Sequence, residues 1–164
     1  MVAGLYDDVH AALHAADVRY VVVGGTAVVL QGHARMTVDL DLVVDLAEAQ
    51  ARAAVRVLLQ VGLLARLPVP PEQFADSEIR RGWVEHRNLL VFSFYDPSNP
   101  LREVDLFATE PMPFDELYAA SDLITVGRTP VRVASRGHLI AMKRAAGRAV
   151  DLQDVEALEQ GDRP

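Results

Sequence analysis

The sequence predicts an α/β domain built on a small mixed β-sheet that is flanked by helices. Apolar residues recur at helical spacing from Gly4 to Ala16, and the apolar run from Tyr20 to Val23 that follows has the composition of a buried strand. Residues 38–44 instead alternate apolar and polar side chains, which is the period-two pattern of a strand. Helical and strand-like segments therefore follow one another along the chain, as they do in α/β proteins.

The rest of the chain continues this alternation. Asp45 and Ser135 are each placed to cap a helix, and Asp96 to Pro100 (DPSNP) has the composition of a connection between two antiparallel strands. We expect one domain over residues 1–164, with a core in residues 18–110 and two C-terminal helices in residues 135–160. Helices are expected over residues 26–31, 47–61, 72–81, 114–121, 139–146 and 150–158, and strands over residues 89–95, 103–107, 124–126 and 131–133.

Composition narrows the chemistry that the chain can carry. The 164 residues include no cysteine, which excludes disulfides, thiolate zinc sites and a cysteine nucleophile. A formal charge of −7 argues against a sequence-blind nucleic-acid clamp, because such proteins rely on many contacts to phosphate. No stretch has the ~20 apolar residues that a membrane helix needs, and the start of the chain lacks the pattern of a signal peptide. We therefore expect a cytoplasmic protein without a membrane segment.

Three aspartates stand in predicted strands. Asp39 and Asp41 share one face of strand 38–44, roughly 6.5 to 7 Å apart by strand geometry, and Asp105 lies between apolar residues of strand 103–107. Burying an unpaired carboxylate is costly, and a hard cation would relieve that cost. Mg²⁺ binds a few carboxylates together with substrate phosphate, and two such ions suit a phosphoryl displacement. We therefore predict that Asp39, Asp41 and Asp105 are catalytic and bind two Mg²⁺ ions, with Mn²⁺ as a substitute.

These acids also have simpler interpretations. An Asp-Leu-Asp strand is common on the solvated face of an antiparallel sheet, and Asp105 alone suits a salt bridge to Arg102 or Arg35. The pair Gly24-Gly25 favours the catalytic interpretation. Glycines between a strand and a helix let a triphosphate approach the backbone and the amides of the helix N-terminus. By itself, such a pair is more often a simple turn.

Together these segments resemble a known superfamily. VVVGGTAVVLQGHARMTVDLDLVV, followed later by EVDLF, is similar to the nucleotidyltransferase signature of a glycine pair, Asp-x-Asp and a third acid on a later strand. The match is best with small AbiEii-type nucleotidyltransferase-like proteins, and the residues that carry it are Gly24, Gly25, Thr26, Ala27, Gly32, Arg35, Thr37, Asp39 and Asp41. The C-terminal SRGHLIAMKRAAGRAVDLQDVEAL resembles the end of that group, where a lysine and a later aspartate, here Lys143 and Asp151, lie on two helices.

The resemblance implies a minimal nucleotidyltransferase fold and a metal-dependent enzyme that moves a nucleoside monophosphate from a nucleoside triphosphate to an acceptor hydroxyl. The acceptor is tRNA, a protein or a small molecule, and an antitoxin is a candidate partner. The resemblance also implies nucleotide binding by Gly24, Gly25, Thr26, Arg35, Thr37, Lys143 and Asp151. Gly25 departs from the family pattern, because many active members have serine at this position.

A different class of function stays open. The same scaffold suits a nucleotide-binding or partner-binding module without turnover, or one half of a toxin-antitoxin pair that acts only with its partner. Lys143, the only lysine of the chain, is either a solvated helix residue or a contact for substrate phosphate. His10 and His14 lie one helical turn apart without a third metal ligand, so we expect both on the helix surface.

Overall fold

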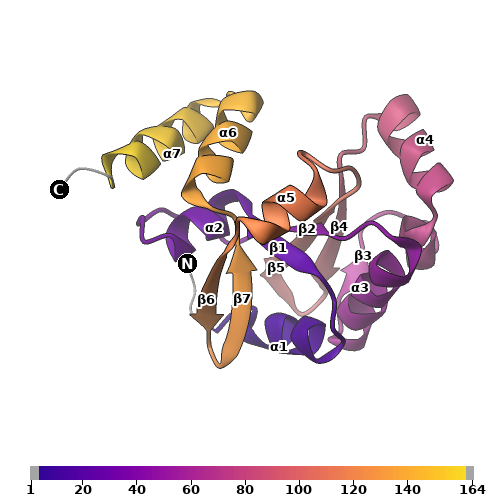
Figure 1. Cartoon of the computed structure of the whole chain (residues 1–164). Helices are drawn as coiled ribbons and strands as arrows, with labels where there is room; N and C mark the ends of the chain where they lie inside the picture. The colour runs from indigo at the N-terminus through magenta and orange to yellow at the C-terminus, as the bar shows by residue number, and fades with distance from the viewer. Residues whose placement is uncertain (1–3, 162–164) are drawn as a thin grey trace.

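The computed structural model describes residues 4–161, which form one mixed seven-stranded sheet with helices packed on it (Figure 1). In chain order the elements are α1 (Asp7–Ala15), β1 (Tyr20–Val23), α2 (Gly24–Leu30), β2 (Leu40–Val44), α3 (Glu48–Gln60), β3 (Leu64–Ala65), the 3₁₀ helix η1 (Pro71–Ala75), α4 (Ser77–Arg87), β4 (Val91–Asp96), β5 (Asn99–Phe107), α5 (Phe114–Ala119), β6 (Asp122–Val126), β7 (Thr129–Val133), α6 (Arg136–Ala146) and α7 (Ala149–Gln160). This architecture confirms the predicted fold class. No helix within residues 4–161 is long and apolar enough to cross a membrane.

The strand order β3-β4-β5-β2-β1-β7-β6 brings segments that are far apart in sequence to the centre of the sheet. β2 runs antiparallel to β1 and parallel to β5, and β1 runs parallel to β7. Because β1 and β7 are parallel, the helices that follow them, α2 and α6, start at the same edge of the sheet. α6 packs against both α2 and α7 at that edge (Figure 1).

Apolar strand residues make the core beneath this edge. All of β1 is buried, and Leu40 and Leu42 of β2 pair with the equally buried Val104 and Leu106 of β5. The helices α1 and α3 contact each other and pack on β7 and β2 respectively. Burial of these side chains is the main stabilising contribution, and it places the strand ends that carry polar residues at a rigid edge.

Two local predictions are confirmed. β4 and β5 pair as antiparallel neighbours, and only the two residues 97–98 of the DPSNP segment separate them. Ser135 caps α6, because its hydroxyl oxygen accepts a hydrogen bond of 3.2 Å from the backbone N–H of His138. Both features depend on residues within one turn of each other, which is why the sequence shows them.

Several predicted boundaries are wrong. The strand expected over residues 38–44 begins at Leu40, so Asp39 precedes it, because pairing with β1 and β5 starts only there. α2 begins at Gly24 and not at Thr26. The two-residue strand β3 was not predicted, since it is too short to show a period.

Two capping and helix predictions also fail. Asp45 does not cap α3, whose N-cap is Ala47; its carboxylate instead accepts a hydrogen bond of 2.9 Å from the Ala47 N–H. Residues 72–81 do not form one helix, because η1 ends before Asp76. That carboxylate accepts hydrogen bonds from the N–H groups of Glu78 and Ile79, and so starts α4.

Candidate functional site

Asp41 and Asp105 lie side by side at the centre of the sheet. β2 and β5 are parallel, and Asp41 is paired directly with Asp105 across them. Residues paired in this way point to the same face of a sheet. On the other side of β2, Asp41 is paired with Val23, the residue before the glycine pair. Two acids and the end of β1 therefore meet at one point.

Asp39 is exposed and directly precedes β2, two residues before Asp41. Its carbonyl oxygen accepts a hydrogen bond of 2.7 Å from the hydroxyl of Thr26, which is buried in α2. Thr26 is one of the residues predicted to bind nucleotide. In the structure, the hydroxyl of Thr26 fixes the backbone of Asp39.

Burial and mutual repulsion raise the pKa values of the carboxylates. Burial raises the pKa of Asp41 to about 6, and the charges of Asp105 and Asp39 add to this effect, whereas Lys143 and Arg148 oppose it. Burial also raises the pKa of Asp105, again with a contribution from Asp39. The pKa of Asp39 is raised mainly by desolvation. Negative charge is thus concentrated at this edge of the sheet.

The salt-bridge interpretation of Asp105 is wrong. Arg102 pairs with Asp8 at 2.5 Å, and Arg35 pairs with Asp154 at 2.5 Å. One carboxylate oxygen of Asp105, Oδ1, is buried without a hydrogen-bond partner among the described residues. Such an oxygen is costly to bury, so its demand for a donor or a cation is unmet within residues 4–161.

A divalent cation fits the chemistry of this set of acids. Carboxylate oxygens are the protein ligands that Mg²⁺ prefers, and a bound cation would both satisfy Oδ1 of Asp105 and offset the repulsion that raises the pKa of Asp41. Within residues 4–161, no group of three or more histidine, aspartate or glutamate side chains is arranged to hold a metal ion. Asp39, Asp41 and Asp105 therefore do not form a ready three-carboxylate metal site in this structure.

Gly24 lies against Asp41 at the start of α2. Its φ is +68°, in the left-handed region that favours glycine. A Cβ at this position would lie only 2.1 Å from Oδ2 of Asp41. Both the backbone conformation and the position of the carboxylate therefore require glycine here.

Gly25 has a different reason to lack a side chain. A Cβ at this position would lie 2.7 Å from Oγ1 of Thr37 and 3.0 Å from Nη1 of Arg35. Arg35 and Thr37 therefore occupy the space that a residue-25 side chain would need. A serine at position 25 would therefore have to displace Thr37 or Arg35, which gives a structural context for the departure from the family pattern.

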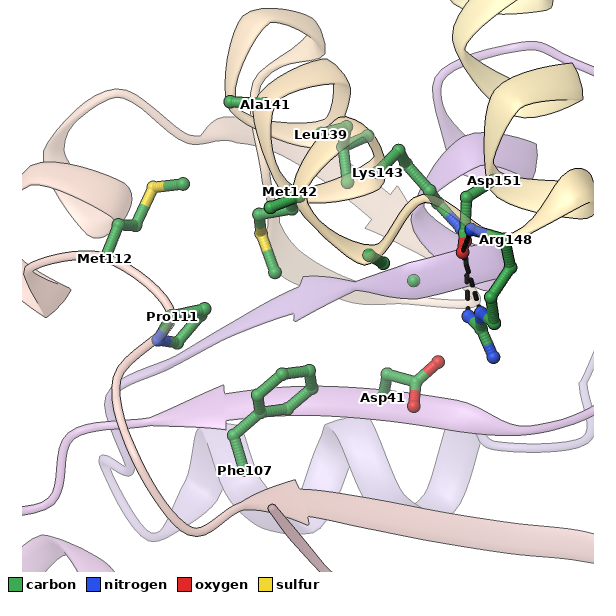
Figure 2. A pocket seen from close by; sticks show the side chains of 13 residues that line it. Asp41, Phe107, Pro111, Met112, Leu139, Ala141, Met142, Lys143, Arg148 and Asp151 are labelled. Atoms are coloured by element: carbon green, nitrogen blue, oxygen red, sulfur yellow. Dashed lines mark hydrogen bonds and ion pairs between the residues drawn. The ribbon is translucent and has the colours of Figure 1, made fainter.

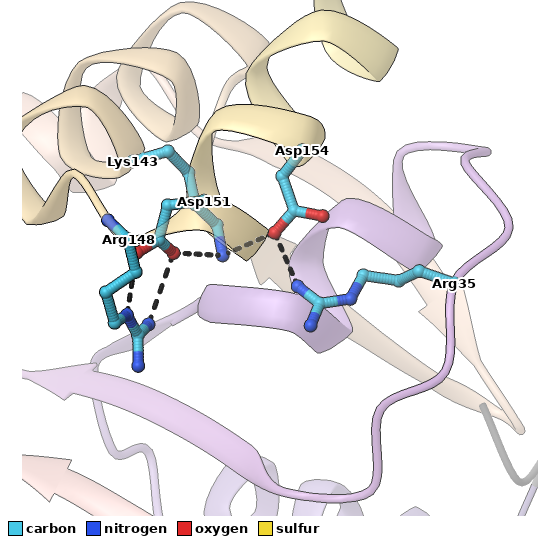
Figure 3. A network of polar contacts seen from close by, with 5 residues as sticks. All are labelled: Arg35, Lys143, Arg148, Asp151 and Asp154. Carbon is cyan, nitrogen blue, oxygen red and sulfur yellow. Dashed lines mark hydrogen bonds and ion pairs between the residues drawn. The ribbon is translucent and has the colours of Figure 1, made fainter.

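Lys143 is buried between two carboxylates (Figure 3). Its Nζ lies 2.8 Å from Oδ2 of Asp154 and 3.4 Å from Oδ1 of Asp151. Arg35 reaches Asp154 from the loop before β2, and the Nε of Arg148 lies 2.7 Å from Oδ2 of Asp151. Charged residues from that loop, from α6 and from the start of α7 therefore form one connected network.

Arg148 and Asp154 belong to this network but are absent from the predicted site. Both are spaced three residues from Asp151, so the three share one face of the helical turn that starts α7. That spacing is the sequence signal that could have found them. The carboxylate of Asp151 is fully buried, whereas the side chain of Arg148 is 73% exposed.

A pocket of about 310 Å³ connects the acids of the sheet with the C-terminal helices (Figure 2). Its polar part is lined by Gly24, Asp41, Lys143, Arg148 and Asp151. Its apolar part comes from the end of β5, the following loop and α6, and is lined by Phe107, Pro111, Met112, Leu139, Ala141, Met142, Ala145 and Ala146. Figure 2 shows Arg148 and Met112 on opposite sides of this space. The pocket suits a ligand with an anionic part and an apolar part.

Comparisons with known proteins identify the family and similar folds. A family model described as Nucleotidyl transferase AbiEii toxin, Type IV TA system, matches residues 9–158. The fold is similar to that of ANT(2″)-Ia in complex with adenylyl-2″-tobramycin, with a TM-score of 0.62, 14% identity, and coverage of 96% of this chain and 87% of that chain. It is also similar to an antigenic nucleotidyltransferase-like protein from Paracoccidioides brasiliensis, with a TM-score of 0.56, 15% identity, and coverage of 95% and 74%. Among curated proteins, no significant match is found.

Proposed function

The chain belongs to the AbiEii nucleotidyltransferase toxin family, and we propose that it transfers a nucleoside monophosphate from a nucleoside triphosphate to an acceptor hydroxyl. One observation carries the proposal: Asp41 and Asp105 are paired in register beside Gly24, in the wall of a pocket that holds further charged residues. Neither carboxylate has an ion-pair partner within 4 Å among the described residues, so a purely structural role does not account for them.

Asp39, Asp41 and Asp105 would hold two Mg²⁺ ions, with Mn²⁺ as a substitute. When bound, the metal neutralises phosphate charge and polarises the phosphate that reacts. The raised pKa values of Asp41 and Asp105 support this assignment, because burial and neighbouring acids make the charged carboxylates costly, and a bound cation would offset that cost.

The proposed reaction forms one bond and breaks one. The acceptor oxygen attacks the α-phosphorus in line, the bond from the α-phosphorus to the bridging oxygen breaks, and pyrophosphate leaves. The hydroxyl proton passes to the carboxylate of Asp105, which burial makes a stronger base by raising its pKa. Positioning of the two reactants and neutralisation of their charge supply the acceleration.

The division of the pocket into a polar and an apolar part would orient a bound nucleotide. The residues predicted to bind nucleotide lie in its polar part or next to it: Gly24, Gly25, Arg35, Thr37, Lys143 and Asp151. We place the phosphates there and the nucleobase against the apolar part, around Phe107, Met112 and Met142. No charged side chain lines the apolar part, so the base is held by van der Waals contact and not by side-chain hydrogen bonds.

The acceptor is a hydroxyl of tRNA or of a protein, and an antitoxin protein is the proposed partner. The description of the matching family as a toxin of a toxin-antitoxin system supports that partner. The exposed position of Asp39, at the entrance to β2, supports a macromolecular acceptor because it leaves this end of the acid row accessible from solvent.

Transfer of label tests the proposal. The purified chain is incubated with each α-labelled nucleoside triphosphate, with Mg²⁺ or Mn²⁺, and with total RNA or cell extract, and pyrophosphate is measured. We expect label in RNA or protein together with pyrophosphate release, and loss of both in Asp41→Asn and in Asp105→Asn. Asp115→Asn is a matched control, because this side chain is 87% exposed on α5 and does not line the pocket.

The outcomes separate the two candidate functions. Nucleotide binding without pyrophosphate release, with every acceptor fraction and also with the antitoxin present, would assign the chain to the binding modules. Transfer that persists in both variants would show that these acids are not the catalytic residues.

A further inference from the structure

We propose that Arg148, and not Lys143, makes the direct contact with the phosphates of the bound nucleotide, and that Lys143 is a positioning residue that holds Asp151 in place for Arg148. The inference rests on the proposed function, because it requires an anionic ligand in the polar part of the pocket. Arg148 is outside the predicted site, in which Lys143 was the cation expected to contact substrate phosphate.

The charge of Lys143 is already neutralised inside the protein. Its side chain is 8% exposed, and Nζ lies within 4 Å of both Asp154 and Asp151. These carboxylates are themselves 7% and 0% exposed. If Lys143 turned to a phosphate, it would leave two buried carboxylates with fewer partners, and a buried charge without its partner is strongly destabilising.

Arg148 has the opposite properties. Its side chain is 73% exposed and lines the same pocket, and Figure 2 shows its guanidinium extending toward the side of Asp41. Nε donates to Oδ2 of Asp151 at 2.7 Å and Nη2 donates to Oδ1 at 3.2 Å. An arginine has five N–H donors, so the remaining donors of this group face the pocket or solvent and are available to a ligand.

The contact with Asp151 orients the guanidinium of Arg148 and occupies only two of its N–H donors with side-chain hydrogen bonds. The two parallel hydrogen bonds fix the plane of the guanidinium, and Oδ2 of Asp151 also accepts from the backbone N–H of Arg148 at 3.1 Å. Asp151 is held in turn by Lys143. A guanidinium fixed in this way loses little conformational entropy when it binds phosphate, and its forked donors match phosphate oxygens.

The charge balance of the network agrees with this division of roles. Lys143, Arg35 and Arg148 carry three positive charges, and Asp151 and Asp154 carry two negative charges (Figure 3). One positive charge is in excess. Arg148 is the member of the network with the most exposed cationic side chain, against 23% for Arg35 and 8% for Lys143. The excess charge is therefore presented to the pocket by Arg148.

Calorimetric titration of the full chain with Mg²⁺ tests the inference, with three probes: inorganic tripolyphosphate, a nucleoside triphosphate and the matching nucleoside. Arg148→Gln should weaken binding of both phosphate probes by about tenfold to a hundredfold, the range for charge-assisted hydrogen bonds, and leave nucleoside binding unchanged. Arg148→Lys should restore part of the loss, since it keeps the charge without the fork. Arg144→Gln is the matched control, because Arg144 is an exposed arginine on α6 that pairs with Glu159 and does not line the pocket.

A second variant tests Lys143 without leaving a buried charge unpaired. Lys143→Met combined with Asp154→Asn removes one charge of each sign. Tripolyphosphate affinity should fall by no more than about threefold, because Asp151 loses the support of Lys143 but keeps its three hydrogen bonds from Arg148. A loss as large as that of Arg148→Gln would assign the phosphate contact to Lys143 and overturn the inference. Wild-type affinity for tripolyphosphate in Arg148→Gln, or an equal loss for the nucleoside, would overturn it too, while leaving the proposed function in place. A wild-type chain that binds neither phosphate probe would overturn both.

Discussion

Lowering the pH from 7 to 5 should remove much of the stabilising contribution of one residue, His10 in α1. His10 is 1% exposed, and its Nδ1 lies 2.9 Å from the hydroxyl of Tyr20. Burial lowers the pKa of His10 to about 4, against the opposing effect of Asp7 and Asp8. The expectation that His10 lies on the helix surface is therefore wrong, whereas His14 is exposed as expected.

The sign and size of the effect follow from the two pKa values. Native His10 stays neutral down to about pH 4, but the unfolded chain takes up a proton below its ordinary pKa of 6.5. The stabilising contribution is therefore complete above pH 6.5 and is lost as the pH falls toward 4. Linkage gives a loss of about 2 kcal/mol at pH 5 and about 3 kcal/mol at pH 4. For a domain of this size, the contribution of His10 lost at pH 5 is equivalent to about 4 to 8 °C in Tm, and protonation of Asp41 opposes it in the wild type.

The assay compares two variants of the same helix. Urea unfolding of the wild type, His10→Gln and His14→Gln is followed between pH 7.5 and 5.0, and the free energy of unfolding is plotted against pH. Other titrating groups are common to all three proteins, so the difference from the wild type isolates the one histidine. We expect His10→Gln to lack about 2 kcal/mol of the decline toward pH 5, and His14→Gln to follow the wild type. Parallel curves for all three proteins would refute the reasoning.

Three further predictions concern the site. Asp41→Asn should stabilise the metal-free protein by about 1 to 3 kcal/mol at pH 7.5, because the pKa of Asp41 is raised to about 6. This gain in stability should fade as the pH drops from 6 toward 4. A lower Tm of the variant in EDTA at pH 7.5 would instead mark Asp41 as a structural ion-pair partner. Gly24→Ala should lower stability by about 2 to 4 kcal/mol, since the new Cβ meets Oδ2 of Asp41 in a left-handed backbone; an unchanged urea midpoint would contradict the geometry. Lys143→Ala should cost about 3 to 5 kcal/mol in thermal unfolding because it leaves Asp151 and Asp154 without their shared cation, and a shift under 1 kcal/mol would place Lys143 on the solvated face.

Local patterns were enough to predict much of the fold. The period-two residues of β2, the turn between β4 and β5 and the Ser135 cap each depend on neighbours within a few positions, and the structure has all three. The glycine pair after β1 belongs to the same class, because a left-handed Gly24 is a property of the backbone at a strand-to-helix junction. The acids could also be placed on strands from sequence alone, within the two-residue error that moved Asp39 outside β2.

Tertiary structure decided which of these residues meet. No local sequence pattern shows that Asp41 pairs with Asp105, because this pairing depends on how β2 and β5 align, and the two residues are 64 positions apart in the chain. His10 and His14 look alike in a helical pattern, yet only His10 packs against Tyr20. Lys143 could be identified by its motif, but its ion pairs are made by the fold: Asp154 contacts it and also pairs with Arg35, which lies 119 positions before Asp154 in the chain. Burial and charge compensation are sums over neighbours in space. The sequence could therefore identify the charged residues of this site, and only the folded chain determined that Lys143 is buried between carboxylates while Arg148 is exposed at the pocket.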